Sequence, residues 1–193
     1  SHVTCYFGCF RQAIMNHQPI TYELSTLADT ESMAQRVAEH LTAPLAMALV
    51  GTLGSGKTQW TRFLLAKLGI AKEQVTSPTY VLQHTYLGPW PIHHFDFYRL
   101  ESVAQVWDLG IDELYEQRCL VIIEWADKFP ECLPDDCLTI EFLETSLNGR
   151  TAILSASGPR AAQLLQRLSE THLLSARNSE WPKDGNQEDC DET

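Results

Sequence analysis

"LVGTLGSGKTQW", residues 49–60, identifies the architecture of this chain more strongly than any other segment. Within it, Gly51 to Thr58 matches the pattern G-x-x-x-x-G-K-[ST]. A loop with little side-chain bulk can wrap around a polyphosphate and point successive backbone N–H groups at it. Lys57 would supply a charge for the β and γ phosphates, and the Thr58 hydroxyl is a hard oxygen ligand for Mg²⁺. This segment therefore predicts binding of a nucleoside triphosphate together with Mg²⁺.

The segments on either side of the loop support this prediction. Residues 45–51 form a continuous apolar run, which is typical of a strand buried on both faces. Residues 59–68 carry bulky apolar side chains at helical spacing, and Gly69 is expected to end that helix. A strand, a glycine-rich loop and a helix in this order are the context in which the motif binds phosphate.

The rest of the chain predicts further alternation of strands and helices. We expect strands at 19–24, 80–86, 92–97, 119–125, 137–144 and 150–157, and helices at 28–41, 101–116 (interrupted near Gly110) and 159–174. The interleaved order favours an α/β, P-loop NTPase-like fold with a mainly parallel central sheet flanked by helices. The last two strands are expected to form a C-terminal antiparallel pair, joined by a turn at Asn148-Gly149.

Composition predicts one globular domain. The chain has 193 residues, of which 44% are hydrophobic and 20% charged. We expect a P-loop ATPase domain over 19–174, a disordered N-terminal extension or cloning remnant at 1–18, and an acidic disordered tail at 175–193. We find no long apolar run for a membrane span, and the six cysteines form no C-x-x-C pair. We therefore expect a cytoplasmic protein with free thiols and no membrane partner.

The net charge of -11 argues against direct binding of nucleic acid. Contacts to phosphate backbones need Lys and Arg, so a strongly acidic chain is a poor candidate for binding DNA or tRNA by itself. Action on nucleic acid through a basic partner remains open.

Two carboxylates stand at the ends of predicted strands. Asp96 lies in "HHFDFYRL" and Glu124 in "LVIIEWAD". A P-loop enzyme needs an acid linked to the metal at the end of a neighbouring strand, and a group that positions water or an acceptor. Asp96 and Glu124 are the candidates for these roles. Thr79, in "SPTY", is a further candidate that would reach the metal from a flexible loop, although a plain turn is the better interpretation of that segment alone.

Two aromatic features near these acids have more than one interpretation. His93 and His94 are adjacent on a predicted strand and so point to opposite faces. We expect one of them to be packed and the other to lie near the site. Trp125, beside Glu124, is equally suited to stacking near the nucleotide and to the core.

Five segments together resemble the TsaE (YjeE) family. They are "GTLGSGKTQWTR" (51–62), "SPTYVL" (77–82), "HHFDFYRL" (93–100), "LGIDELY" (109–115) and "VIIEWAD" (121–127). The resemblance covers about residues 20 to 170. It implies a small bacterial cytosolic ATPase needed to make N6-threonylcarbamoyladenosine at position 37 of tRNAs that read codons beginning with A. The family works with the TsaB–TsaD complex, so tRNA would be contacted only indirectly. Separately, P-loop enzymes that lack an arginine finger within their own chain are slow until a partner supplies or positions that charge, so we expect slow hydrolysis by the chain alone. Arg99 is a candidate for such a finger, although a Tyr-Arg pair is equally suited to a structural role.

The resemblance also implies roles for individual residues. The catalytic set would be Lys57, Thr79, Asp96 and Glu124. The ATP-binding set would be Gly51, Leu53, Gly54, Ser55, Gly56, Lys57, Thr58, Thr26, Thr30, Trp125 and Arg150. The Mg²⁺ set would be Thr58, Thr79, Asp96 and Glu124. Tyr98 and Arg99 would lie near the nucleotide or a partner surface.

The sequence departs from the family pattern at two places. Thr52 stands where the family usually has Asp, which removes one acid beside the phosphates. We expect this to alter metal affinity or a base-like role without abolishing binding, because the backbone cradle and Lys57 remain. Ala126 replaces the proline of the family's "EWP".

Two other functions fit a P-loop. A small-molecule or nucleotide kinase usually adds an Arg-rich lid, and no Arg cluster follows the third buried run. A regulatory GTPase reads guanine with an Asn-Lys-x-Asp segment, and the nearest segment here is "EWADK". The ATPase is therefore the favoured prediction, with the kinase as its alternative.

Overall fold

The computed structural model describes residues 18–145 and 149–179, with side chains described as far as Glu170. The described strands are β1 (Ile20–Leu24), β2 (Leu45–Gly51), β3 (Gln83–Leu87), β4 (Pro91–Asp96), β5 (Leu120–Glu124), β6 (Cys137–Glu144) and β7 (Arg150–Ser157). They form a single sheet in the order β1-β7-β6-β2-β5-β4-β3. The central strands β6, β2, β5 and β4 are mutually parallel. The expected α/β fold with a mainly parallel centre is confirmed.

Antiparallel pairing is confined to the outer strands. β6 and β7 form the predicted C-terminal antiparallel pair, with Cys137 opposite Ser157 and Glu144 opposite Arg150. β1 joins the free side of β7, and β3 joins the free side of β4, both antiparallel. The turn expected between β6 and β7 lies partly outside the described residues.

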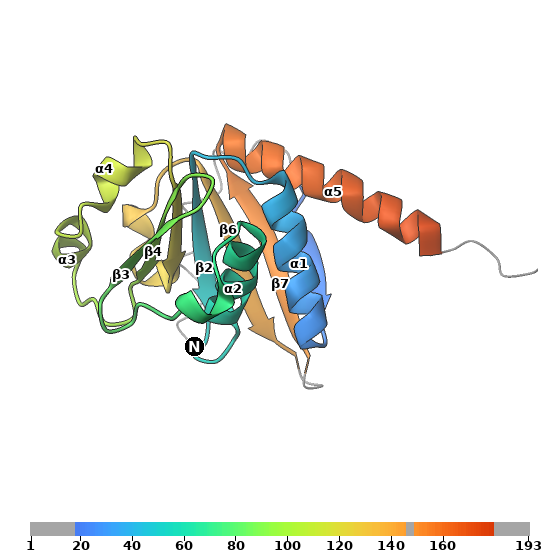
Figure 1. Cartoon of the computed structure of the whole chain (residues 1–193), viewed down its shortest axis with the longest axis horizontal. Helices are drawn as coiled ribbons and strands as arrows, with labels where there is room; N and C mark the ends of the chain where they lie inside the picture. The colour runs from blue at the N-terminus through green and yellow to red at the C-terminus, as the bar shows by residue number, and fades with distance from the viewer. Residues whose placement is uncertain (1–17, 146–148, 180–193) are drawn as a thin grey trace, which may run out of the picture.

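Helices cover both faces of the sheet. The helices are α1 (Leu27–His40), α2 (Lys57–Lys67), α3 (Val103–Trp107), α4 (Ile111–Tyr115) and α5 (Pro159–Ser179), with short 3₁₀ turns η2 (Lys72–Gln74), η3 (Ala126–Lys128) and η4 (Pro130–Cys132). Figure 1 shows α1, α2 and α5 on one side of the sheet, and α3 and α4 on the other. The sheet is therefore the middle layer of three.

The core follows the two-residue period of the strands. On β2, Met47 and Leu49 pack into the cluster that contains α1, α2 and α5, whereas Ala46 and Ala48 pack into the opposite cluster. β5 alternates in the same way, with Ile122 on the α2 side and Ile123 on the other. Both strands are buried on both faces, which explains their continuous apolar sequences.

Two element boundaries differ from the expected ones by more than two residues. β3 begins at Gln83 because Leu82 donates a 2.6 Å hydrogen bond back to the Pro78 carbonyl and takes a φ of 68°, closing a turn. Tyr80 and Val81, expected in the strand, lie in this turn and are 86% and 60% exposed. Helix α5 continues to Ser179, past the expected end at 174, because neither Gly nor Pro interrupts it there.

Other expectations have a mixed outcome. The expected interruption near Gly110 is confirmed: this residue separates α3 from α4 with a φ of 67°. Residues 1–17 and 180–193, where we expected an extension and most of the tail, lie outside the described residues. In the part of the chain that is described, the structure has no helix long and apolar enough to cross a membrane.

Candidate functional site

The loop between β2 and α2 takes a backbone path that requires glycine. Gly51, Gly54 and Gly56 have φ values of 146°, 80° and 107°. A β-carbon at Gly51 would lie 2.7 Å from both the Phe142 carbonyl oxygen and the Ser55 hydroxyl oxygen. The loop is thus pressed against β6, and its free side faces outward.

The end of this loop is the start of α2. The helix begins at Lys57, and the first helical hydrogen bond from Trp60 reaches the Gly56 carbonyl at 2.8 Å. The free N–H groups of the first turn therefore adjoin the loop, as in a phosphate-binding helix terminus. A β-carbon at Gly56 would lie 3.4 Å from Nη1 of Arg150, so the Arg150 guanidinium also adjoins the loop.

Lys57 is folded back over the loop. Its Nζ donates to the carbonyl oxygens of Gly51 at 2.6 Å and Thr52 at 2.9 Å, and it lies 4.0 Å from the centroid of the Trp125 ring. Its side chain is buried, with 4% of the residue exposed. The ammonium is thus held by neutral carbonyls and an aromatic ring, and a phosphate oxygen would be a stronger, charge-assisted partner.

Burial and nearby acids act in opposite directions on this ammonium. Burial lowers the pKa of Lys57, and the charges of Glu124, Asp127 and Asp96 partly oppose that shift. All three acids therefore lie close enough to the ammonium to interact with it electrostatically.

Thr58 and Glu124 form the second contact of the site. The Thr58 hydroxyl donates to Oε2 of Glu124 at 2.8 Å. Glu124 is 2% exposed, and its other carboxylate oxygen, Oε1, lies 2.9 Å from Nε2 of the fully buried His94. A hydroxyl and a carboxylate in contact are an oxygen donor set of the kind that suits Mg²⁺.

Asp96 lies beside Glu124 but has its own partners. The two residues are paired in the β4–β5 register. Oδ2 of Asp96 accepts hydrogen bonds from Thr79 at 2.5 Å and Ser77 at 3.0 Å, and Oδ1 accepts from the Tyr98 backbone N–H at 2.8 Å. Asp96 therefore fixes the 77–79 loop, and Glu124 contacts the glycine-rich loop.

Trp125 and Tyr98 lie at the glycine-rich loop, whereas Arg99 lies in a separate cavity. Trp125 takes a φ of 58°, and its ring lies against that of Tyr98 with centroids 4.8 Å apart and planes tilted by 42°, so Tyr98 reaches the site through Trp125. The Arg99 guanidinium instead lies 5.0 Å from the Tyr80 ring centroid. It lines a cavity of about 600 Å³ that has no glycine-loop residue in its wall.

The remaining predicted residues lie at or near the same end of the sheet. Leu53 is 76% exposed at the tip of the loop, and Ser55 is 1% exposed beneath it. Thr26 and Thr30 open helix α1, whose first turn lies at the loop end of the sheet in Figure 1. The Thr26 hydroxyl bonds to Asp29 in a capping box, and the Thr30 hydroxyl donates to the Thr26 carbonyl at 3.4 Å. Both hydroxyls are thus used within α1.

Ser77 and Glu144 were not singled out from the sequence, which also left open whether His93 or His94 lies near the site. His94 shares a strand face with Asp96, two residues on, and this spacing was the available signal. Ser77 precedes Thr79 by two residues in the same loop. Glu144 accepts a 3.3 Å hydrogen bond from the Thr52 hydroxyl, and no local pattern joins residues so far apart in sequence.

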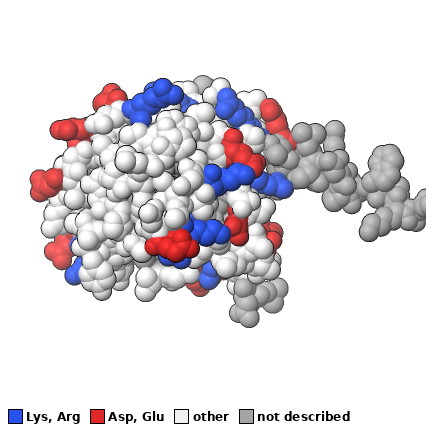
Figure 2. Space-filling view, viewed as in Figure 1, with Lys and Arg blue, Asp and Glu red and all other residues white. Residues whose placement is uncertain are grey.

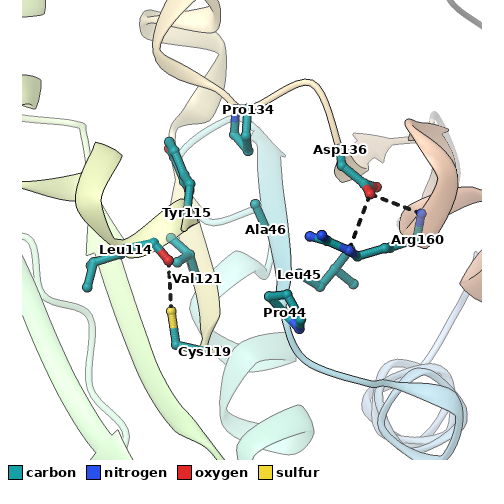
Figure 3. A pocket seen from close by; sticks show the side chains of 10 residues that line it. All are labelled: Pro44, Leu45, Ala46, Leu114, Tyr115, Cys119, Val121, Pro134, Asp136 and Arg160. Atoms are coloured by element: carbon teal, nitrogen blue, oxygen red, sulfur yellow. Dashed lines mark hydrogen bonds and ion pairs between the residues drawn. The ribbon is translucent and has the colours of Figure 1, made fainter. Parts of the chain in front are cut away.

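Cavity volume alone does not select the glycine-rich loop, because the cavity beside Arg99 is larger than the one at the loop. A cleft of about 420 Å³ adjoins the loop and is lined by Gly51, Thr52, Trp125 and Asp127 among others. A second pocket, at the opposite end of the parallel strands, has a volume of only about 50 Å³ (Figure 3). Its wall includes Cys119, whose thiol donates to the Leu114 carbonyl at 3.1 Å. It is too small for a nucleotide, which needs hundreds of cubic ångströms.

Comparison with known proteins identifies close parallels. The family model for the threonylcarbamoyl adenosine biosynthesis protein TsaE matches residues 24–152. The Bacillus subtilis tRNA threonylcarbamoyladenosine biosynthesis protein TsaE is 32% identical over 142 residues, covering 73% of this chain and 88% of the relative. The Haemophilus influenzae protein of the same name is 32% identical over 135 residues, covering 68% and 85%. The crystal structure of Bacillus subtilis YdiB superposes with a TM-score of 0.68 at 26% identity, covering 80% of this chain and 97% of YdiB.

Proposed function

This chain belongs to the TsaE family, a family of tRNA threonylcarbamoyladenosine biosynthesis, and on that basis we propose that it is a Mg²⁺-dependent ATPase. Its role would be in modification at position 37 of tRNAs that read codons beginning with A, in the cytoplasm and together with TsaB and TsaD. The observation that carries the ATPase proposal is the glycine-rich loop, with Lys57 held on its carbonyls and Thr58 in contact with Glu124.

The chain's own residues suit the steps of phosphate binding. The loop and the first turn of α2 offer N–H groups to the phosphates, and Lys57 exchanges two carbonyl partners for phosphate oxygens. Thr58 and Glu124 would hold Mg²⁺, with Asp96 and Thr79 behind them, and the ion when bound neutralises charge on the phosphates. Among the described residues no group of three or more His, Cys, Asp and Glu could hold a metal by itself. This agrees with Mg²⁺, which is usually held by one or two carboxylates plus phosphate.

Glu124 and Asp96 would have different roles in hydrolysis. Glu124 contacts the glycine-loop threonine, so it would orient a water molecule or the metal at the phosphates. Asp96 would act through the 77–79 loop, because it accepts hydrogen bonds from both Ser77 and Thr79. The guanidinium of Arg99, the candidate arginine finger within the chain, lies over the Tyr80 ring and not at the glycine-rich loop. This supports slow hydrolysis by the chain alone and activation by a partner that supplies the missing charge.

The surface charge supports docking on protein rather than on tRNA. Most of the face seen in Figure 2 is uncharged, its Lys and Arg side chains stand in separate groups, some beside Asp or Glu, and the described residues form no continuous basic patch there. With a net charge of -11, the pure protein is expected not to bind tRNA at physiological salt. Filter binding or fluorescence anisotropy with labelled tRNA tests this, and tight, salt-sensitive binding would contradict it.

The decisive experiment is steady-state ATP hydrolysis by the pure protein, alone and with TsaB–TsaD added. We expect a low rate that rises sharply with the pair, and no rise for Lys57→Ala. A rate unchanged by the pair would refute partner activation. In that case, phosphate transfer to small-molecule acceptors would be screened, because a kinase is the alternative for this fold.

A further inference from the structure

His94 is a buried polar residue that the proposed mechanism does not yet use. It lies on β4 and none of its surface is exposed. Its Nε2 lies 2.9 Å from Oε1 of Glu124, while its Nδ1 has no hydrogen-bond partner among the described residues. Buried polar atoms normally have a hydrogen-bond partner, so an apolar side chain would suit this position better if it served only to fill the core. The contact of one ring nitrogen with Glu124 therefore calls for a functional explanation.

The strand register explains how His94 reaches Glu124. His94 pairs with Ile122 and Asp96 pairs with Glu124, so His94 is the diagonal neighbour of Glu124. Ile122 and Glu124 are two residues apart and share a face, as do His94 and Asp96. His93 points to the other face, where its Nδ1 lies 3.2 Å from the Thr85 hydroxyl oxygen. The strand therefore assigns only one of the two histidines to the site.

The contact supplies an orientation that Glu124 cannot supply itself. The last torsion of a glutamate side chain is broad, so its own rotamer does not fix the plane of the carboxylate. Here Oε1 is bound by His94 and Oε2 by the Thr58 hydroxyl, which defines that plane. An ionised carboxylate can only accept, so an ionised Glu124 takes the shared hydrogen from Nε2 of His94.

We propose that His94 is a positioning residue that anchors Oε1 of Glu124 and thereby presents Oε2 to Thr58 at the mouth of the glycine-rich loop. The inference rests on the proposed function, because it assigns Glu124 to the Mg²⁺–nucleotide site. Without the anchor, Oε1 would be a buried acceptor with no partner, and the carboxylate would turn away from Thr58. Partners of this kind, one step removed from a metal, typically change metal affinity or activity by about 10- to 100-fold when they are removed.

The test compares variants that keep or remove the donor. His94→Phe keeps a ring and removes both nitrogens, whereas His94→Gln places an amide N–H near the position of Nε2. His93→Phe is the matched control on the opposite face. The first readout is the affinity for the non-hydrolysable ATP analogue AMP-PNP, measured by calorimetry with Mg²⁺ and with EDTA. The second is kcat and KM for ATP.

We expect His94→Phe to lose roughly 10-fold or more of the Mg²⁺-dependent gain in affinity, with affinity in EDTA unchanged. It should lower kcat more than it changes KM. His94→Gln should recover most of both effects, and His93→Phe should match wild type. The double variant His94→Phe/Glu124→Gln should be no worse than Glu124→Gln alone, because His94 acts through Glu124.

Each contrary outcome has a distinct meaning. The role of His94 would be overturned if His94→Phe kept the wild-type Mg²⁺ dependence and kcat. It would also be overturned if the losses of the two single variants added up in the double variant. Either result would leave the ATPase proposal standing. A wild-type protein that binds no AMP-PNP would overturn both. If His94→Phe does not unfold cooperatively, His94→Asn replaces it, since its shorter amide does not reach Glu124. Equal behaviour of His94→Asn and His94→Gln would then refute the proposal.

Discussion

Replacing Gly51 by alanine should destabilise the domain more than the same change at any open glycine of the loop. The new β-carbon would lie 2.7 Å from the Phe142 carbonyl oxygen, which is β6 backbone and cannot move alone, and 2.7 Å from the Ser55 hydroxyl oxygen. The φ of 146° is also unfavourable for alanine, at about 1–3 kcal/mol. Overpacking of a closed site adds about 1–3 kcal/mol. The expected loss of unfolding free energy is therefore about 2–6 kcal/mol.

Gly54→Ala is the matched control for this experiment. Gly54 has a φ of 80°, but a β-carbon there would meet nothing within 4 Å. We expect a loss of only about 1–2 kcal/mol from backbone strain. The entropy that alanine removes from the unfolded chain is the same in both variants and cancels in their difference. Urea unfolding should show a lower midpoint for Gly51→Ala with an unchanged slope. Equal midpoints for the two variants would refute the steric argument.

Further predictions concern the charged and titratable side chains. Lys57→Ala should weaken ATP binding roughly 10- to 100-fold, as expected for lost charge-assisted hydrogen bonds, and calorimetry would measure it. Asp96→Asn and Glu124→Gln should each lower kcat by about 10²-fold or more while changing ATP affinity much less. Single-turnover assays would separate the two effects. Equal losses in kcat and in ATP affinity would contradict the assignment. Burial lowers the pKa of His93 below its usual 6.5. Below about pH 6.5 the unfolded chain therefore binds more protons at this residue than the folded chain does, and the free energy of unfolding decreases as the pH is lowered. His93→Gln should therefore lose less unfolding free energy than wild type between about pH 7.5 and about pH 5.5 in urea titrations, and an identical loss would count against this linkage.

The sequence predicts an element well where its apolar residues follow the burial of that element closely. β2 and β5 are buried on both faces, so their continuous apolar runs are unambiguous. The alternation at 80–86 was misleading, because Tyr80 and Val81 are exposed in a turn rather than alternating on a strand. The positive φ of Leu82 closes that turn, and a leucine gives no sequence signal for such a conformation.

The candidate site was predictable where one short segment supplies the geometry. The glycine-rich loop is such a segment, and the structure gives Gly51, Gly54 and Gly56 the positive φ values that the motif suggests. The contacts of Glu124 and Asp96 depend instead on the β4–β5 register, which joins residues 28 positions apart. No local pattern encodes such a pairing. The roles of these acids therefore stay predictions.

The place of β1 at the edge of the sheet has a consequence for how the protein is made. Its neighbour in the sheet is β7, and Ile20 pairs with Leu154. At about 5–20 residues per second, a ribosome needs roughly 7–25 s to add the ~130 residues between them. For all of that interval β1, the first strand among the described residues, lacks its native neighbour β7. The edge of the sheet at β1 can therefore form only after β7 has been made, and a chain released early leaves β1 without its native partner and open to proteases and chaperones.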